Sequence, residues 1–161
     1  GPHSISVSVS GTKNPASAFN WVTLDAFVAG AGLPSGSAFE DNSAFVTYTG
    51  TWPTWSNAGN SGGTAHYSAN TGSTATFNFS GQYVGVVYEK DFNGGIATIK
   101  VDGVVVDQLD TYAATAAFQQ QKFYAVAAGP HSISVSVSGN RNPASTSNWV
   151  TLDAFVAETS P

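Results

Sequence analysis

Residues suited to recognising a polar ligand gather around two turns of this sequence. Trp55 lies in the loop-like stretch TGTWPTWSN, and a polar group approaches a Gly-Gly turn, namely Tyr88, Glu89, Lys90, Asp91 and Asn93. A sugar ring presents apolar C–H faces and a rim of hydroxyls, so its site needs aromatic faces beside hydrogen-bonding groups. We therefore predict a shallow polar site at one end or on one face of the fold. The candidate ligand-binding residues are Trp55, Tyr88, Lys90, Asp91, Tyr112, Gln120, Arg141 and Asn142.

Catalytic signatures are absent from the sequence. The three histidines are His3, His66 and His131, and no Gly-x-Ser-x-Gly, His-Glu-x-x-His or P-loop motif accompanies them. Glycoside hydrolysis requires two carboxylates flanking one cleft, whereas most acidic residues here fall in expected turns. We therefore do not expect an enzyme.

The amino-acid composition argues against nucleic acid and membrane as binding partners. Net charge is −5 with only five Lys and Arg among 161 residues, which argues against nucleic acid, because binding phosphates requires clustered cations. No apolar run approaches the roughly 20 residues that span a bilayer, so membrane insertion is not expected. Cysteine is absent, and polar uncharged residues must form most of the surface. This composition favours an extracellular protein, either secreted or at the cell surface.

A repeat organises the chain. Residues 1–29 read GPHSISVSVSGTKNPASAFNWVTLDAFVA, and residues 129–157 repeat this segment with four differences. The differing pairs are Thr12/Asn140, Lys13/Arg141, Ala18/Thr146 and Phe19/Ser147. We interpret residues 1–29 as the C-terminal hairpin of a preceding tandem repeat and residues 30–36 (GAGLPSG) as a linker. Residues 37–157 form the complete repeat, and residues 158–161 begin the next linker.

Alternating apolar and polar residues predict strands throughout. SISVSVSG, at residues 4–11 and 132–139, is typical of a half-buried strand. In WVTLDAFVA, strict alternation places Trp21, Thr23, Asp25 and Phe27 on one face, and residues 149–157 repeat the pattern. Further strands are expected at 44–49, 64–69, 73–80, 82–90, 96–101, 104–109 and 118–125, with a tight hairpin at Asp102-Gly103. About nine strands per unit predict an all-β, antiparallel jelly-roll β-sandwich.

Several stretches resemble one known family in collinear order. FEDNSAFVTYTGTW (39–52) resembles its opening acidic pair and strand, and residues 72–103 resemble its Phe-x-Phe-x-Gly strand, Gly-rich turn and Val-Asp-Gly hairpin. The closing Gly-x-His and Leu-Asp-x-Phe strands follow. The unit thus resembles the galactose-binding-domain-like β-sandwiches, which include many non-catalytic carbohydrate-binding modules. The resemblance implies a β-sandwich fold, and carbohydrate binding as one function within a broad family.

The same resemblance implies a metal site. Related modules often carry a structural calcium between the first and last strands, and Glu40, Asp41 and Asp153 match those positions. Carboxylate oxygens are suitable calcium ligands, although no Asp-x-Asp-x-Asp-Gly loop is present. No other cofactor is required.

Two functions remain open. The first is a non-catalytic module that binds a glycan or polysaccharide. The alternative is a structural or adhesive stalk or filament subunit that joins neighbouring copies of itself head-to-tail by exchanging the duplicated hairpin. Trp55 discriminates between them, since a Trp55 exposed beside Tyr112 or Lys90 favours ligand binding and a buried one favours a scaffold.

Overall fold

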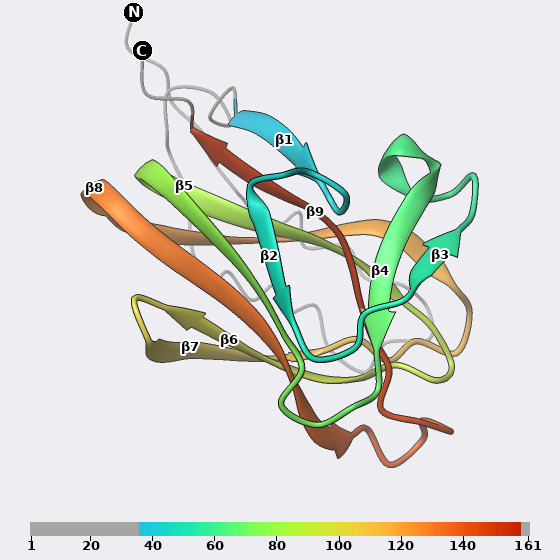
Figure 1. The fold of residues 1–161 in the computed structure, drawn as a ribbon. Coiled ribbons are helices and arrows are strands. Elements are labelled where there is room, and N and C mark those ends of the chain that lie inside the picture. The colour runs from blue at the N-terminus through green and yellow to red at the C-terminus, as the bar shows by residue number, and fades with distance from the viewer. Residues whose placement is uncertain (1–35, 159–161) are drawn as a thin grey trace, which may run out of the picture. The chain divides into compact units, whose positions relative to one another are not determined.

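Nine strands and one 3-10 turn make up the part of the chain that the computed structural model describes, residues 36–158 (Figure 1). The elements are β1 (Gly36–Glu40), β2 (Val46–Thr49), β3 (Thr54–Ser56), η1 (Ser61–Gly63), β4 (Thr64–Ser68), β5 (Thr74–Lys90), β6 (Gly95–Val101), β7 (Val104–Asp110), β8 (Ala117–Arg141) and β9 (Val150–Glu158). The predicted all-β, antiparallel β-sandwich of about nine strands is confirmed. The hairpin predicted at 1–29, most of the linker 30–36 and residues 159–161 lie outside the described residues.

Two layers arise because β5 and β8 are long enough to belong to both (Figure 1). Residues 74–81 of β5 and 129–141 of β8 lie in one layer with β2, β6 and β7. Residues 83–90 of β5 and 117–125 of β8 lie in the other with β9, which also pairs with β1 and β4, while β3 pairs with β4.

Each long strand changes layer at a glycine. Gly81 and Gly129 face each other in register, with φ of 154° and 139°, which are conformations that L side chains rarely adopt. The sequence pattern predicted each long strand as two separate strands, because the alternation breaks at these glycines. The break marks a bend in a continuous strand and not a loop.

The core fills the space between the layers. In SISVSVSG of β8, the side chains of Ile133, Val135 and Val137 are buried, as the alternation predicts. Phe77 of β5 stacks on Phe155 of β9 with ring centroids 5.2 Å apart. Burying an aliphatic or aromatic side chain of this size contributes about 1.5–3 kcal/mol, so these strands carry much of the stability.

A bulge in β9 changes which residues face the core. Val87 pairs with Ala154 and Tyr88 pairs with Leu152, so Asp153 is the extra residue between them. Leu152 and Phe155 are consequently both fully buried. The prediction of strict alternation in residues 149–157 is therefore wrong after Leu152. It placed Phe155 on the same face as Trp149 and Thr151, whereas Phe155 faces the core.

Candidate functional site

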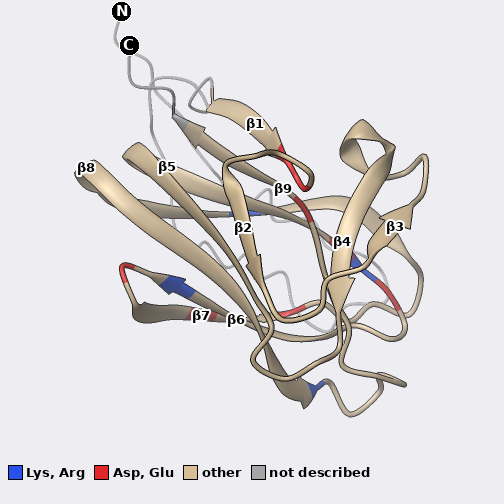
Figure 2. Ribbon diagram, in the orientation of Figure 1, with Lys and Arg blue, Asp and Glu red and all other residues tan. Residues whose placement is uncertain are grey.

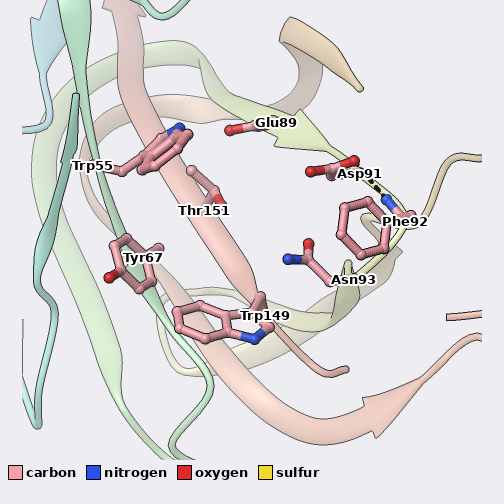
Figure 3. Close-up of a pocket in the computed structure, with 8 residues that line it drawn as sticks. All are labelled: Trp55, Tyr67, Glu89, Asp91, Phe92, Asn93, Trp149 and Thr151. Atoms are coloured by element: carbon pink, nitrogen blue, oxygen red, sulfur yellow. Dashed lines mark hydrogen bonds between the residues drawn. The ribbon is translucent and has the colours of Figure 1, made fainter. Parts of the chain in front are cut away.

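A pocket of about 320 Å³ lies on the layer that contains β3, β4, β9 and the second half of β5 (Figure 3). The residues that line it come from these strands, from the turn after β5 and from the position just before β9. They are Trp55, Tyr67, Glu89, Asp91, Phe92, Asn93, Trp149 and Thr151. The pocket therefore combines aromatic rings, two carboxylates, an amide and a hydroxyl.

Strand register brings the pocket residues to one face. Trp55 pairs with Ala65, and Tyr67 pairs with Thr151. Since side chains of paired residues lie on the same face and alternate along a strand, Trp55, Tyr67 and Thr151 share the face that points away from the core. Glu89 joins them because its neighbour Tyr88 is buried in the core opposite Leu152.

Backbone hydrogen bonds join the turn at residues 91–94 to two other segments of the chain. Asp91 N–H donates to the carbonyl of Thr111 at 3.1 Å, and Trp149 N–H donates to the carbonyl of Asn93 at 3.2 Å. A Cβ at Gly94 would overlap the Thr111 carbonyl, so only glycine permits this close approach. The turn thereby fixes Asp91 and Asn93 beside the start of β9.

Aromatic rings form one side of the pocket. Tyr67 packs against Trp149 with ring centroids 4.6 Å apart and an interplanar angle of 40°. Trp55 is 43% exposed and Phe92 is 53% exposed, so both offer ring surface to a ligand. Figure 3 shows Trp55, Tyr67 and Trp149 on one side, across from Glu89, Asp91 and Asn93. A ligand with an apolar face and polar edges fits such a site.

The polar side of the pocket is acidic. Glu89 is 8% exposed, and burial, with help from Asp91 and Asp153, raises the pKa of its carboxyl to about 7. An Oδ1 atom of Asp91 accepts a hydrogen bond from Phe92 N–H at 2.7 Å. None of the described Lys and Arg residues lines the pocket, and Figure 2 shows how sparsely they are placed on the fold.

Of the eight predicted binding residues, the pocket contains Trp55 and Asp91. The ring of Tyr88 is buried in the core. Gln120 donates to the Phe118 carbonyl, Arg141 to the Thr146 carbonyl and Asn142 to a carboxylate oxygen of Asp110. Lys90 and Tyr112 are not among the lining residues.

Four lining residues, Tyr67, Phe92, Trp149 and Thr151, were not predicted. Tyr67 and Thr151 meet at the pocket through the pairing of β4 with β9, and Trp149, just before β9, bridges to Gly94 of the turn. Sequence patterns do not reveal which strands pair. Glu89, at the end of β5, and Asn93, in the turn that follows, belong to the polar group that the sequence placed around this Gly-Gly turn.

The residues matched to the family's calcium site lie where β1, η1 and β9 meet. Ser61 of η1 donates its N–H to Asp153 Oδ2 at 3.1 Å and its hydroxyl to Glu40 Oε1 at 2.8 Å. Glu40 Oε2, Asp153 Oδ1 and both polar side-chain atoms of Asn60 are buried without a hydrogen-bond partner. Burial and the nearby carboxylates raise the pKa of Asp153 to about 6.

Asp41 differs from the other two carboxylates. Its Oδ1 accepts from the Thr64 hydroxyl at 2.9 Å, and its Oδ2 lies 2.7 Å from His66 Nδ1. Tyr48 donates its hydroxyl to the Asp41 carbonyl and stacks on His66. Both carboxylate oxygens of Asp41 are thus engaged by protein groups. Within residues 36–158, no three Asp, Glu or His side chains converge as a ready metal cluster.

The chain is similar to parts of larger proteins. It is 35% identical over 98 residues, 60% of its length, to the A type blood N-acetyl-α-D-galactosamine deacetylase of Flavonifractor plautii, and this match covers 13% of that protein. Xanthan lyase from Paenibacillus superposes with a TM-score of 0.60 at 20% identity, over 86% of this chain and 14% of the lyase. The exo-β-1,3-galactanase of Phanerochaete chrysosporium with galactose superposes with a TM-score of 0.51 at 25% identity, over 76% of this chain and 29% of the galactanase.

The chain therefore spans less than a third of each of these proteins. No family model matches it. Within the described residues, no helix is long and apolar enough to cross a membrane. The β-sandwich fold that the resemblance to galactose-binding-domain-like proteins implied is confirmed.

Proposed function

We propose that residues 36–158 form a non-catalytic module that binds glycans in the pocket between Trp55 and Trp149. One observation carries this proposal, the convergence of four aromatic rings with carboxylate, amide and hydroxyl groups in one pocket. The aromatic rings accept the C–H face of a pyranose, and the polar groups bind its hydroxyls. The likeness to proteins named for their action on carbohydrates supports the same conclusion.

The arrangement of the two pocket carboxylates favours binding over hydrolysis. Glu89 and Asp91 are two residues apart in sequence, and Figure 3 shows them side by side on one side of the pocket. The catalytic carboxylates of glycosidases stand on either side of the scissile bond instead. We propose accordingly that the module retains a glycan without cleaving it, and that it does so outside the cell.

Replacing Trp149 by Ala tests the pocket. We expect W149A, and to a lesser extent W55A, to lose at least about tenfold in affinity for the glycan that a polysaccharide screen identifies, because each loses a stacking face. Affinity electrophoresis and isothermal titration calorimetry measure the loss. The control is F45A, since Phe45 is 68% exposed and lies outside the pocket.

Unchanged affinity in folded W149A and W55A would contradict this site. Release of reducing ends from the bound glycan by the wild-type protein would contradict the non-catalytic assignment. The two tests are independent, because the first measures glycan binding and the second measures glycan cleavage.

We also propose that the junction of β1, η1 and β9 holds a structural calcium ion. Glu40, Asp153 and Asn60 fit a hard cation, because each has a buried oxygen without a partner. Asp41 adds negative charge nearby, while its own oxygens hold Thr64 and His66. A bound cation would offset the repulsion between the carboxylates and join the first and last strands.

Calcium should therefore stabilise the fold. At calcium concentrations about a hundred times the dissociation constant, the free energy of unfolding should rise by about 2.7 kcal/mol, and EDTA should reverse the rise. The double variant E40Q/D153N should lose this response, whereas D107N, which removes a carboxylate elsewhere, should keep it. A melting temperature that is identical in calcium and in EDTA would remove the metal proposal and leave the glycan pocket untouched.

A further inference from the structure

The pocket has a charge pattern that narrows its ligand. Glu89 and Asp91 both line it, and none of the described Lys or Arg residues does. A sugar acid would bring a third negative charge into this space. Since like charges a few ångströms apart repel, the pocket disfavours uronates and other anionic sugars.

Glu89 is the residue that most strongly favours a ligand with a positively charged group. The residue is 8% exposed and lines the pocket, and no described residue donates a hydrogen bond to its carboxylate, whose oxygens open to the pocket. The charged groups that act on it are Asp91 and Asp153, which are also acidic. A buried carboxylate normally has a positive or hydrogen-bonding partner, so a positively charged group from the ligand would complete this site.

The aromatic rings also favour a positively charged ligand. Trp55, Tyr67, Phe92 and Trp149 surround the pocket, and the electron-rich faces of such rings attract cations. Rings and carboxylates together are the usual surroundings of a bound ammonium group. The volume of about 320 Å³ also leaves space for a sugar residue and not merely for an ion.

We propose that the pocket selects amino sugars, in which a protonated amine replaces one ring hydroxyl, over neutral and acidic sugars. This inference rests on the proposed glycan binding. The ammonium group binds Glu89 and Asp91, and the ring stacks on Trp55 or Trp149. The remaining hydroxyls bind Asn93 and Thr151.

A matched series of sugars tests the selectivity. Galactosamine, galactose and N-acetylgalactosamine differ only in the group at carbon 2, as do glucosamine, glucose and N-acetylglucosamine. Titration calorimetry or protein NMR near neutral pH gives a dissociation constant for each sugar. We expect the free amine to bind at least about tenfold tighter than the hydroxyl or acetamide sugar of the same configuration.

Two variants identify the source of the preference. E89Q should lower the ratio of amine to hydroxyl affinity toward one, because it removes the buried negative charge. D107N removes a carboxylate outside the pocket that accepts from the Tyr124 hydroxyl, and it should keep the wild-type ratio. A preference that E89Q retains, or that D107N loses, would assign it to the overall negative charge and overturn the inference.

The two proposals fail differently. If neutral sugars bind the wild-type protein as tightly as amino sugars, the pocket binds glycans but the amino-sugar selectivity is wrong. If no sugar of either series and no polysaccharide binds, glycan binding itself is wrong and the selectivity falls with it. Tighter binding of the amino sugar, lost in E89Q alone, supports both.

Discussion

The side chain of Glu89 ends beside Asp91 with no hydrogen-bond donor among the described residues, although it is largely buried. Such a group opposes folding whenever it is ionised, because the folded protein removes it from water without a compensating partner. Groups placed for binding commonly carry such a cost. At the residue scale, Glu89 is therefore explained better by a ligand than by the fold.

The pH dependence of stability tests this reading of Glu89. Its pKa rises from an ordinary 4.5 to about 7 on folding, so between these values the folded state keeps a proton that the unfolded state loses. Stability from this group therefore falls as pH rises from about 4.5 to about 7. E89Q cannot ionise, and we expect it to be more stable than wild type by on the order of 1 kcal/mol at about pH 8, the pocket's opening to water limiting the gain.

Chemical denaturation of both proteins in EDTA, at about pH 4, 6 and 8, measures the difference. The two free energies of unfolding should converge at the acidic end, where Glu89 is protonated in both states. A constant difference across the range would show that the carboxyl titrates normally and that its burial costs nothing.

At the scale of elements, the alternation of apolar and polar residues, together with turn-forming residues, was sufficient to predict most strands. The tight Asp102-Gly103 hairpin between β6 and β7 is present, with Asp102 at φ 50° and Gly103 at φ 79°. Asp102 also accepts hydrogen bonds from Ser132 N–H at 2.8 Å and from His131 Nδ1 at 2.7 Å, which tie this turn to β8. Local patterns predict such elements because their signals lie within a few residues.

The short strands and the pocket were harder to predict. β1 and β3 contain only five and three residues, too few to display a period, and pairing with β9 and β4 defines them. The pocket depends on the register of β3, β4, β9 and β5 and on a bulge at Asp153. Trp55 and Asp91 were predictable because they accompany turn-forming residues, although Trp55 itself lies in the short strand β3. Trp149 resembled any other strand residue until its neighbours were known.

At the scale of the whole molecule, the described copy, residues 129–157, shows what the duplicated segment contributes to a domain. It is not the hairpin that the sequence predicted, because β8 pairs with β5 and β6, whereas β9 pairs with β1, β4 and β5 in the other layer. Residues 129–157 supply much of the core, including Ile133, Leu152 and Phe155, and each of these has an identical residue in the copy at 1–29. The four positions that differ all fall in the connection at residues 140–147, away from the core. Residues 1–29 therefore contain counterparts of the core residues Ile133, Leu152 and Phe155 that residues 129–157 supply.

This identity predicts that the chain associates with itself. Each molecule carries the sequence of residues 129–157 twice, but the strands that pair with this segment only once, so a second molecule can accept the extra copy. We expect light scattering to show a mass that rises with protein concentration for residues 1–161, whereas residues 30–161 remain monomeric. Replacing the apolar Ile5, Val7 and Val9 by Ser in the full chain should restore the monomer, since the β8 counterparts are core residues. Monomers of both lengths at all concentrations would contradict assembly through the hairpin, and the glycan-binding module would then be the function to pursue alone.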